Sequence, residues 1–198
     1  MTGRGGGGGY GPAAKGGGAR MRYAALLRGI NVGGNKKVAM AELRGLLAEL
    51  GHADISTYLQ SGNAVFTSPE QDPRELADAI AAAVEERLGV SIRVVVRTGA
   101  ELAAARQSSP LPGEPENPSR FFVAFLSAPP ARASLDALAA QSFGPDQVWV
   151  SGREAYLWCP NGASETTLTN AFLEKSLGVT ATSRNWNTVT KLVRLTAG

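Results

Sequence analysis

The sequence predicts an α+β fold of two related ferredoxin-like halves, each in the order β-α-β-β-α-β, packed into one compact unit with a C-terminal helix. Three observations predict it. Short apolar runs alternate with segments whose apolar residues recur at helical spacing. The same order of six elements occurs twice. A proline-rich stretch, 108–119, lies between the two occurrences and has the composition of a linker.

The first half, 21–107, begins with an apolar run with charged ends, and a helix follows in which Leu43, Leu46 and Leu47 share one face. Asp72 and Pro73 supply the cap and first position of a second helix. A short helix capped by Thr98 closes this half. The segments expected to form its main elements are strand 22–28, helix 40–50, strands 55–60 and 64–67, helix 72–88 and strand 92–97.

The second half, 120–198, repeats this order, and its hairpin shares a Ser-Gly turn with the first. A final helix, 187–195, directs Val189, Leu192 and Val193 inward. The other expected elements are strand 121–126, a helix around 135–138, strands 148–150 and 155–158, helix 166–177 and strand 180–183.

The N-terminal segment 1–20 holds ten of the 24 glycines and little that can pack, so we expect a disordered tail. It contains three of the 20 basic residues and no acidic residue, which leaves 17 basic against 17 acidic residues in 21–198. The net charge of +3 therefore belongs to the tail. A general affinity of the folded part for polyanions is not expected.

Cys159 is the only cysteine, and 1–20 lacks the apolar stretch of a secretory signal, so we expect a cytoplasmic protein. No run of about 18 apolar residues is present, and no association with a membrane is expected. With His52 as the only histidine, the sequence predicts no metal site and no cofactor.

The loop 28–37 joins a strand to a helix and carries candidate binding residues: Arg28, Asn31, Gly33, Gly34 and Lys37. Glycines that expose backbone amides, a helix N-terminus and lysines together favour an anion site. The spacing fits neither the Walker A loop nor the dinucleotide-binding fingerprint. The alternative is a tight loop with solvated lysines.

Two further polar segments supply candidates. Gln60, Ser61 and Asn63 belong to a hairpin turn, where ordinary turn chemistry is the alternative. The second segment offers a cationic fork, a helix cap, a flat apolar face and a lysine one turn later: Arg184, Asn185, Trp186 and Lys191. An N-cap beside a core tryptophan is the alternative for that segment.

The segments Arg28-Gly29-Ile30-Asn31-Val32-Gly33-Gly34, Gln60-Ser61-Gly62-Asn63 and Arg184-Asn185-Trp186 resemble the signatures of the bacterial family catalogued as domain of unknown function 1697. The resemblance spans about 21–196. It implies an α+β fold of two related ferredoxin-like halves and no established activity. Since polar loops carry the signatures, we expect the three loops to converge on one cleft.

Three functions follow as hypotheses. The first is a site for an anionic small molecule, including a phosphate-bearing one, in which Arg28, Lys37 and Arg184 bind charge. The second is a nucleic-acid-binding module built on a ferredoxin-like sheet. In the third, the protein has a structural or partner-binding role and its polar loops only brace the two halves. The sequence identifies no proton-transfer group and decides neither whether a reaction is catalysed nor the oligomeric state.

Overall fold

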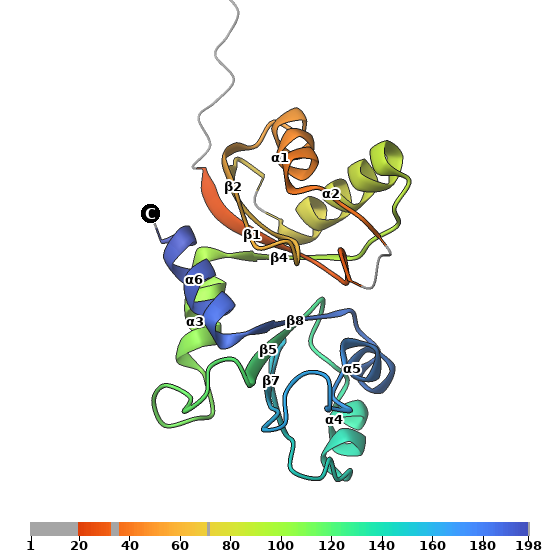
Figure 1. The fold of residues 1–198 in the computed structure, drawn as a ribbon, viewed down its shortest axis with the longest axis vertical. Coiled ribbons are helices and arrows are strands. Elements are labelled where there is room, and N and C mark those ends of the chain that lie inside the picture. Colours follow the sequence, from red (N-terminus) through yellow and green to blue (C-terminus); the bar gives the residue numbers. More distant parts are fainter. Residues whose placement is uncertain (1–19, 33–35, 71, 198) are drawn as a thin grey trace, which may run out of the picture.

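The computed structural model describes residues 20–32, 36–70 and 72–197, and in them an α+β fold with two four-stranded antiparallel sheets. The expected tail, apart from Arg20, lies outside the described residues, as do Gly33 and Gly34 of the glycine-rich loop. Figure 1 shows the two sheets one above the other, with helices on the outer face of each. Within the described ranges, no helix is both long and apolar enough to cross a membrane.

The first sheet has the strand order β2-β3-β1-β4, with β1 central and antiparallel to both neighbours. Strand β1 is apolar on both faces because helices cover one face of the sheet and the second half covers the other. The elements of this half are β1 Met21–Leu27, α1 Met40–Glu49, β2 Ala53–Tyr58, β3 Asn63–Ser68, α2 Pro73–Leu88, β4 Val94–Thr98 and α3 Gly99–Gln107.

The second sheet has the order β6-β7-β5-β8, which repeats the first with β5 in the place of β1. A seventh element, a helix, follows the last strand in both halves. The elements are β5 Phe121–Leu126, α4 Arg132–Ala139, β6 Gln147–Ser151, β7 Glu154–Trp158, α5 Asn170–Leu177, β8 Ala181–Asn185 and α6 Trp186–Thr196.

Three apolar clusters hold these layers together. One lies between the first sheet and α1 and α2, and another between the second sheet and α4 and α5. The third is shared by both halves, since Leu26 and Val95 from the first sheet meet Val123 and Phe125 from the second. Helices α3 and α6 contact each other and complete this central cluster at one side of the molecule (Figure 1).

Several boundaries differ from the sequence prediction: the strand expected at 55–60 is β2, Ala53–Tyr58, which leaves Leu59 and Gln60 in the following turn. Local chemistry sets two further boundaries in the second half. The helix expected from 166 begins at Asn170, because Thr169 caps it by accepting from Phe172 N–H while Thr166 binds Asp146 and Leu168. The strand expected to end at 183 continues to Asn185, and Arg184 pairs with Val123 of β5. Arg184 is therefore held in a sheet.

Candidate functional site

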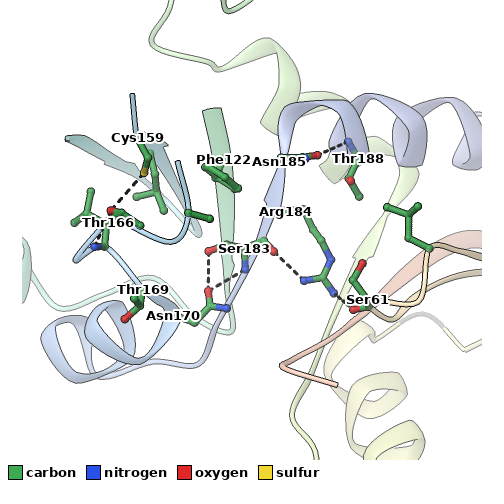
Figure 2. Close-up of a pocket in the computed structure, with 14 residues that line it drawn as sticks. Ser61, Phe122, Cys159, Thr166, Thr169, Asn170, Ser183, Arg184, Asn185 and Thr188 are labelled. Atoms are coloured by element: carbon green, nitrogen blue, oxygen red, sulfur yellow. Dashed lines mark hydrogen bonds between the residues drawn. The ribbon is translucent and has the colours of Figure 1, made fainter. Parts of the chain in front are cut away.

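The guanidinium of Arg184 reaches from β8 into the first half, where it binds the β2–β3 turn (Figure 2). Its Nε donates to Oδ1 of Asn63 at 2.6 Å, and one terminal nitrogen donates to the Ser183 carbonyl at 2.8 Å. The other donates to three carbonyls of the first half, those of Leu27, Ser61 and Gly62, at 2.8, 3.2 and 3.1 Å. Arg184 thus joins the end of β1 and the β2–β3 turn to β8.

The charge of Arg184 lies almost out of solvent, with 8% of the residue exposed. Burial lowers the pKa of Arg184 to about 10, so the side chain remains a cation at neutral pH. Its hydrogen-bond partners in the described part of the chain are all neutral oxygens, and no carboxylate there lies within ion-pair distance of it. A buried cation without a counter-ion makes its surroundings electropositive.

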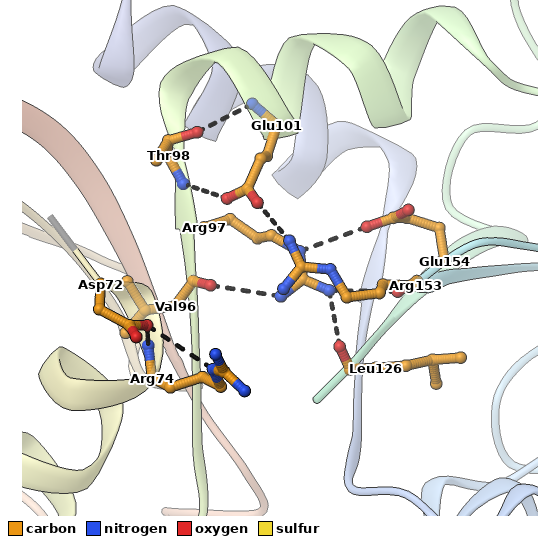
Figure 3. Close-up of polar contacts among 9 residues, drawn as sticks. All are labelled: Asp72, Arg74, Val96, Arg97, Thr98, Glu101, Leu126, Arg153 and Glu154. Atoms are coloured by element: carbon orange, nitrogen blue, oxygen red, sulfur yellow. Dashed lines mark hydrogen bonds and ion pairs between the residues drawn. The ribbon is translucent and has the colours of Figure 1, made fainter. Parts of the chain in front are cut away.

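Arg97 occupies the matching position in the first half (Figure 3). Its side chain crosses the contact region between the two halves, which we call the junction, in the opposite direction. It donates to the carbonyls of Leu126 and Arg153, at 2.7 and 3.1 Å, in the second half. Unlike Arg184 it has an ion-pair partner, since its Nε lies 3.2 Å from Oε1 of Glu154. The pKa of Arg97 is lowered by burial first and by the neighbouring Arg153 second.

Arg28 and Asn31 of the loop 28–37 are held by other contacts. Asn31 donates to the carbonyls of Val38 and Gln60, at 2.9 and 2.7 Å, and accepts from Val38 N–H, so it ties its own loop to the β2–β3 turn. Arg28 forms an ion pair of 2.8 Å with Glu174, a residue of α5. Arg28 and Asn63 therefore connect the two halves, whereas Asn31 holds the β2–β3 turn within the first half.

A pocket of 390 Å³ opens beside this junction, and we call it the junction pocket. Its apolar lining comes from the outer face of the second sheet and the loop before α5, and its polar lining from the ends of β8, α5 and α6 (Figure 2). Of the described lining residues, only Leu59 and Ser61 come from the first half. The described lining residues are Leu59, Ser61, Phe122, Leu157, Cys159, Ala163, Thr166, Leu168, Thr169, Asn170, Ser183, Arg184, Asn185 and Thr188.

Two helices begin at this pocket. Thr169 caps α5, and Asn185 caps α6 by accepting from Thr188 N–H at 3.0 Å. Asn170 accepts from both the amide and the hydroxyl of Ser183, which leaves its Nδ2 group as a donor (Figure 2). Helix N-termini favour negative charge, and no acidic residue is among the described lining residues.

The sulfur chemistry of the pocket is passive. Cys159 donates to Oγ1 of Thr166 at 3.5 Å, and Thr166 donates to Asp146 at 2.5 Å. Burial raises the pKa of the Cys159 thiol, so the thiolate is disfavoured. Among the described residues, no group of three or more His, Cys, Asp or Glu could hold a metal ion.

The remaining predicted site residues lie elsewhere. Trp186 is 3% exposed, and its ring meets Phe121 edge-on and the guanidinium of Arg106, so core contacts occupy the face expected to stack on a ligand. Lys191 is exposed and lines a different hollow, with Trp186 and Arg106. Lys37 and Gln60 are exposed.

Sequence reasoning missed most of the pocket wall. Phe122, Leu157 and Leu168 carry the ordinary signals of strand and core residues, and only their shared position marks them. Arg97 was also missed, although a signal exists for it. An arginine at the end of a strand directly precedes a helix-capping residue in both halves, as Arg97-Thr98 and as Arg184-Asn185.

Comparison with known proteins agrees with the fold. The profile of a family described as "Protein of unknown function (DUF1697)" matches residues 21–156. Among solved structures, the conserved bacterial protein SP0830 from Streptococcus pneumoniae is similar, with a TM-score of 0.69 and 23% sequence identity over 89% of this chain and 99% of that chain. At that identity the likeness shows the fold alone. No curated protein matches the chain.

Proposed function

The chain belongs to the DUF1697 family of proteins of unknown function, and from the chemistry of the junction pocket we propose that it binds a small anionic molecule with an apolar body. The observation that carries the proposal is the charge of Arg184. This buried cation lines the pocket, has only neutral partners among the described residues, and faces no acidic lining residue there. A bound anion would supply the missing counter-charge.

The polar lining at the ends of β8, α5 and α6, which we call the rim, suits the same ligand class. The side-chain amide of Asn170 and the hydroxyl of Thr169 are donors beside the N-termini of α5 and α6, and donors fit a carboxylate or phosphate. Arg184 itself is already engaged by carbonyls, so its part is electrostatic, and the direct contacts come from the rim.

The apolar lining of the pocket determines which chemical group suits the rest of the ligand. Phe122, Leu157 and Leu168 offer carbon surface directly below the rim. An anion bound by the rim must place its remaining atoms on this surface, and burial of apolar groups there contributes about 25 cal/mol per Å². The pocket thus favours an acyl or aryl anion over inorganic phosphate.

The site differs from the one that the sequence alone suggests. Ser61, Arg184 and Asn185 stay in it as pocket residues, while Arg28, Asn31 and Asn63 brace its first-half wall. We do not assign ligand contacts to Gln60, Lys37, Trp186 or Lys191. The bracing hypothesis and the ligand hypothesis are therefore compatible, because the braced junction forms one side of the pocket.

The nucleic-acid alternative gains no support from the sheets. Recognition of RNA by a ferredoxin-like sheet needs an open face with exposed aromatic residues. Here Phe66, Phe121 and Tyr156 are each at most 1% exposed, and helices or the opposite half cover the sheet faces on which they lie.

An isosteric pair of variants tests the charge requirement. Thr169→Asp and Thr169→Asn both keep a capping side chain on α5, but only the first adds a negative charge at the rim. We expect octanoate and octyl phosphate to bind Thr169→Asp about tenfold more weakly than Thr169→Asn at low salt. Isothermal titration calorimetry measures this, with octanol as the uncharged comparison.

Equal affinity of octanoate for Thr169→Asp and Thr169→Asn would show that the pocket does not select charge. Octanol binding as tightly as octanoate would lead to the same conclusion. A wild type that binds none of the three probes contradicts the proposed function as a whole.

We further propose that both halves are ferredoxin-like and arose by duplication. Support comes from the repeated order of seven elements, the equal strand orders β2-β3-β1-β4 and β6-β7-β5-β8, and the corresponding arginines Arg97 and Arg184. The hydrogen bonds Leu27 N to Gly62 O and Leu126 N to Arg153 O also occupy corresponding places.

A further inference from the structure

Leu59 combines two unfavourable features at the mouth of the junction pocket. Its backbone has a φ of 59°, in the left-handed region that is unfavourable for a residue that carries a Cβ, such as leucine. Its side chain also remains largely in solvent, since the residue is 52% exposed. Glycine or asparagine would remove the strain, and folding gains little from an exposed leucine.

The turn around Leu59 is held without help from its side chain. Asn63 donates to the Tyr58 carbonyl at 2.7 Å, Asn31 donates to the Gln60 carbonyl, and Arg184 binds the next two carbonyls. Gly62 closes the turn at a φ of 82°, where an added Cβ would lie 2.7 Å from Cδ1 of Ile30. These contacts fix the position of Leu59 independently of its own side chain.

The corresponding turn of the second half lacks such a residue. Only Gly152 and Arg153 separate β6 from β7, whereas the four residues 59–62 separate β2 from β3. The longer turn is the one that borders the junction pocket, and Leu59 is its apolar contribution to the lining. The longer β2–β3 turn therefore places a leucine where a ligand would enter the junction pocket.

On the basis of the proposed function, we propose that Leu59 determines specificity by packing on the apolar body of the bound anion. The ligand class is accordingly a carboxylate or a phosphate monoester with a chain long enough to reach from the rim of α5 and α6 to the β2–β3 turn. Leu59 acts as a preformed cover, since rigid placement before binding avoids an ordering cost.

Two substitutions test this role because both residues tolerate a left-handed backbone. Leu59→Gly removes the side chain, and Leu59→Asn replaces it with a polar one of similar size. We expect both variants to be at least as stable as the wild type and to bind decanoate about tenfold more weakly, with a smaller loss for butanoate. Leu50→Asn is the control, since Leu50 is 38% exposed and lies outside the pocket lining.

The outcomes separate the two proposals. If decanoate binds the wild type and discriminates Thr169→Asp from Thr169→Asn, but binds Leu59→Gly and Leu59→Asn with unchanged affinity, the role of Leu59 is refuted and the anion site stands. If decanoate does not bind the wild type, both proposals fail. A tenfold loss in both Leu59 variants and none in Leu50→Asn supports the specificity role.

Discussion

At the residue scale, the main feature is a buried charge that differs between two corresponding arginines. Arg97 and Arg184 both cross the junction and bind carbonyls of the opposite half. Only Arg97 has a carboxylate partner, Glu154, and the residue at the corresponding place opposite Arg184 is the neutral Asn63. This single difference in sequence makes the surroundings of Arg184 electropositive and underlies the proposed function.

His52 provides a pH-dependent contribution to stability. Both ring nitrogens are buried without a hydrogen-bond partner in the described structure, and the ring stacks on Phe66 at 4.5 Å between centroids. Burial lowers the pKa of His52 from its ordinary value of 6.5. The unfolded chain therefore binds a proton more readily, and stability rises with pH in the range where the two states differ.

We expect the wild type to lose stability relative to His52→Phe as the pH falls from about 7.5 to 5.5, because the loss begins near the unfolded pKa. Urea unfolding of both proteins across this range measures the difference and removes the contribution of carboxylates common to both. A constant difference between the two curves would show that His52 titrates alike in the folded and unfolded chain.

At the element scale, the packing of α3 against α6 requires close contact of their backbones. A Cβ added at Gly99, the first residue of α3, would lie 2.8 Å from the carbonyl oxygen of Thr196 near the end of α6. At Gly45, within α1, an added Cβ would meet nothing within 4 Å. The same substitution therefore has opposite expected effects in two helices.

We predict that Gly45→Ala raises the free energy of unfolding by up to about 1 kcal/mol, because alanine favours the helix. Gly99→Ala should lower it by about 1–3 kcal/mol, since backbone must move to admit the methyl group. Chemical denaturation of the two variants measures both effects. A stabilised Gly99→Ala would mean that α3 and α6 separate without cost.

At the scale of the whole molecule, the halves share a core. The central cluster takes residues from both sheets and from α3 and α6, and the two arginines add hydrogen bonds in opposite directions across the junction. Such a junction couples the unfolding of the halves, because neither can expose its inner face alone without opening the cluster.

We expect the wild type to unfold in one transition. Far-ultraviolet circular dichroism reports on both halves, whereas Trp149, Trp158 and Trp186 all lie in the second half. The transitions measured by dichroism and by tryptophan fluorescence should therefore coincide. Arg184→Lys should shift both midpoints together, at a cost of about 2 kcal/mol, because one ammonium group cannot replace the five hydrogen bonds. Separate midpoints for the two probes would mean that the halves unfold independently.

The order of the elements and most of their bounds could be predicted from the sequence, because hydrophobic period, caps and turn residues act within a few residues of each other. The strand 121–126 and the capped helix after Thr98 are examples, and both occur in the structure. The prediction that the loops of Arg28, Asn63 and Arg184 converge on one cleft rested on resemblance to a family. Arg184 binds Asn63 and lines the pocket, whereas Arg28 pairs with Glu174, and neither Arg28 nor Asn63 is among the described lining residues. Their hydrogen-bond partners could not be predicted, since those partners lie up to 157 positions away along the chain.

The sequence by itself determined an α+β chain of two similar halves, three polar loops and a neutral folded part. Tertiary structure alone decided that Arg184 donates hydrogen bonds to carbonyls of the first half and that Trp186 is buried against Phe121. It also decided that a pocket forms between α5, α6 and the β2–β3 turn. The physical reason is that local signals depend on neighbouring residues, whereas the desolvation and pairing of a charge depend on segments that only the packed fold brings together.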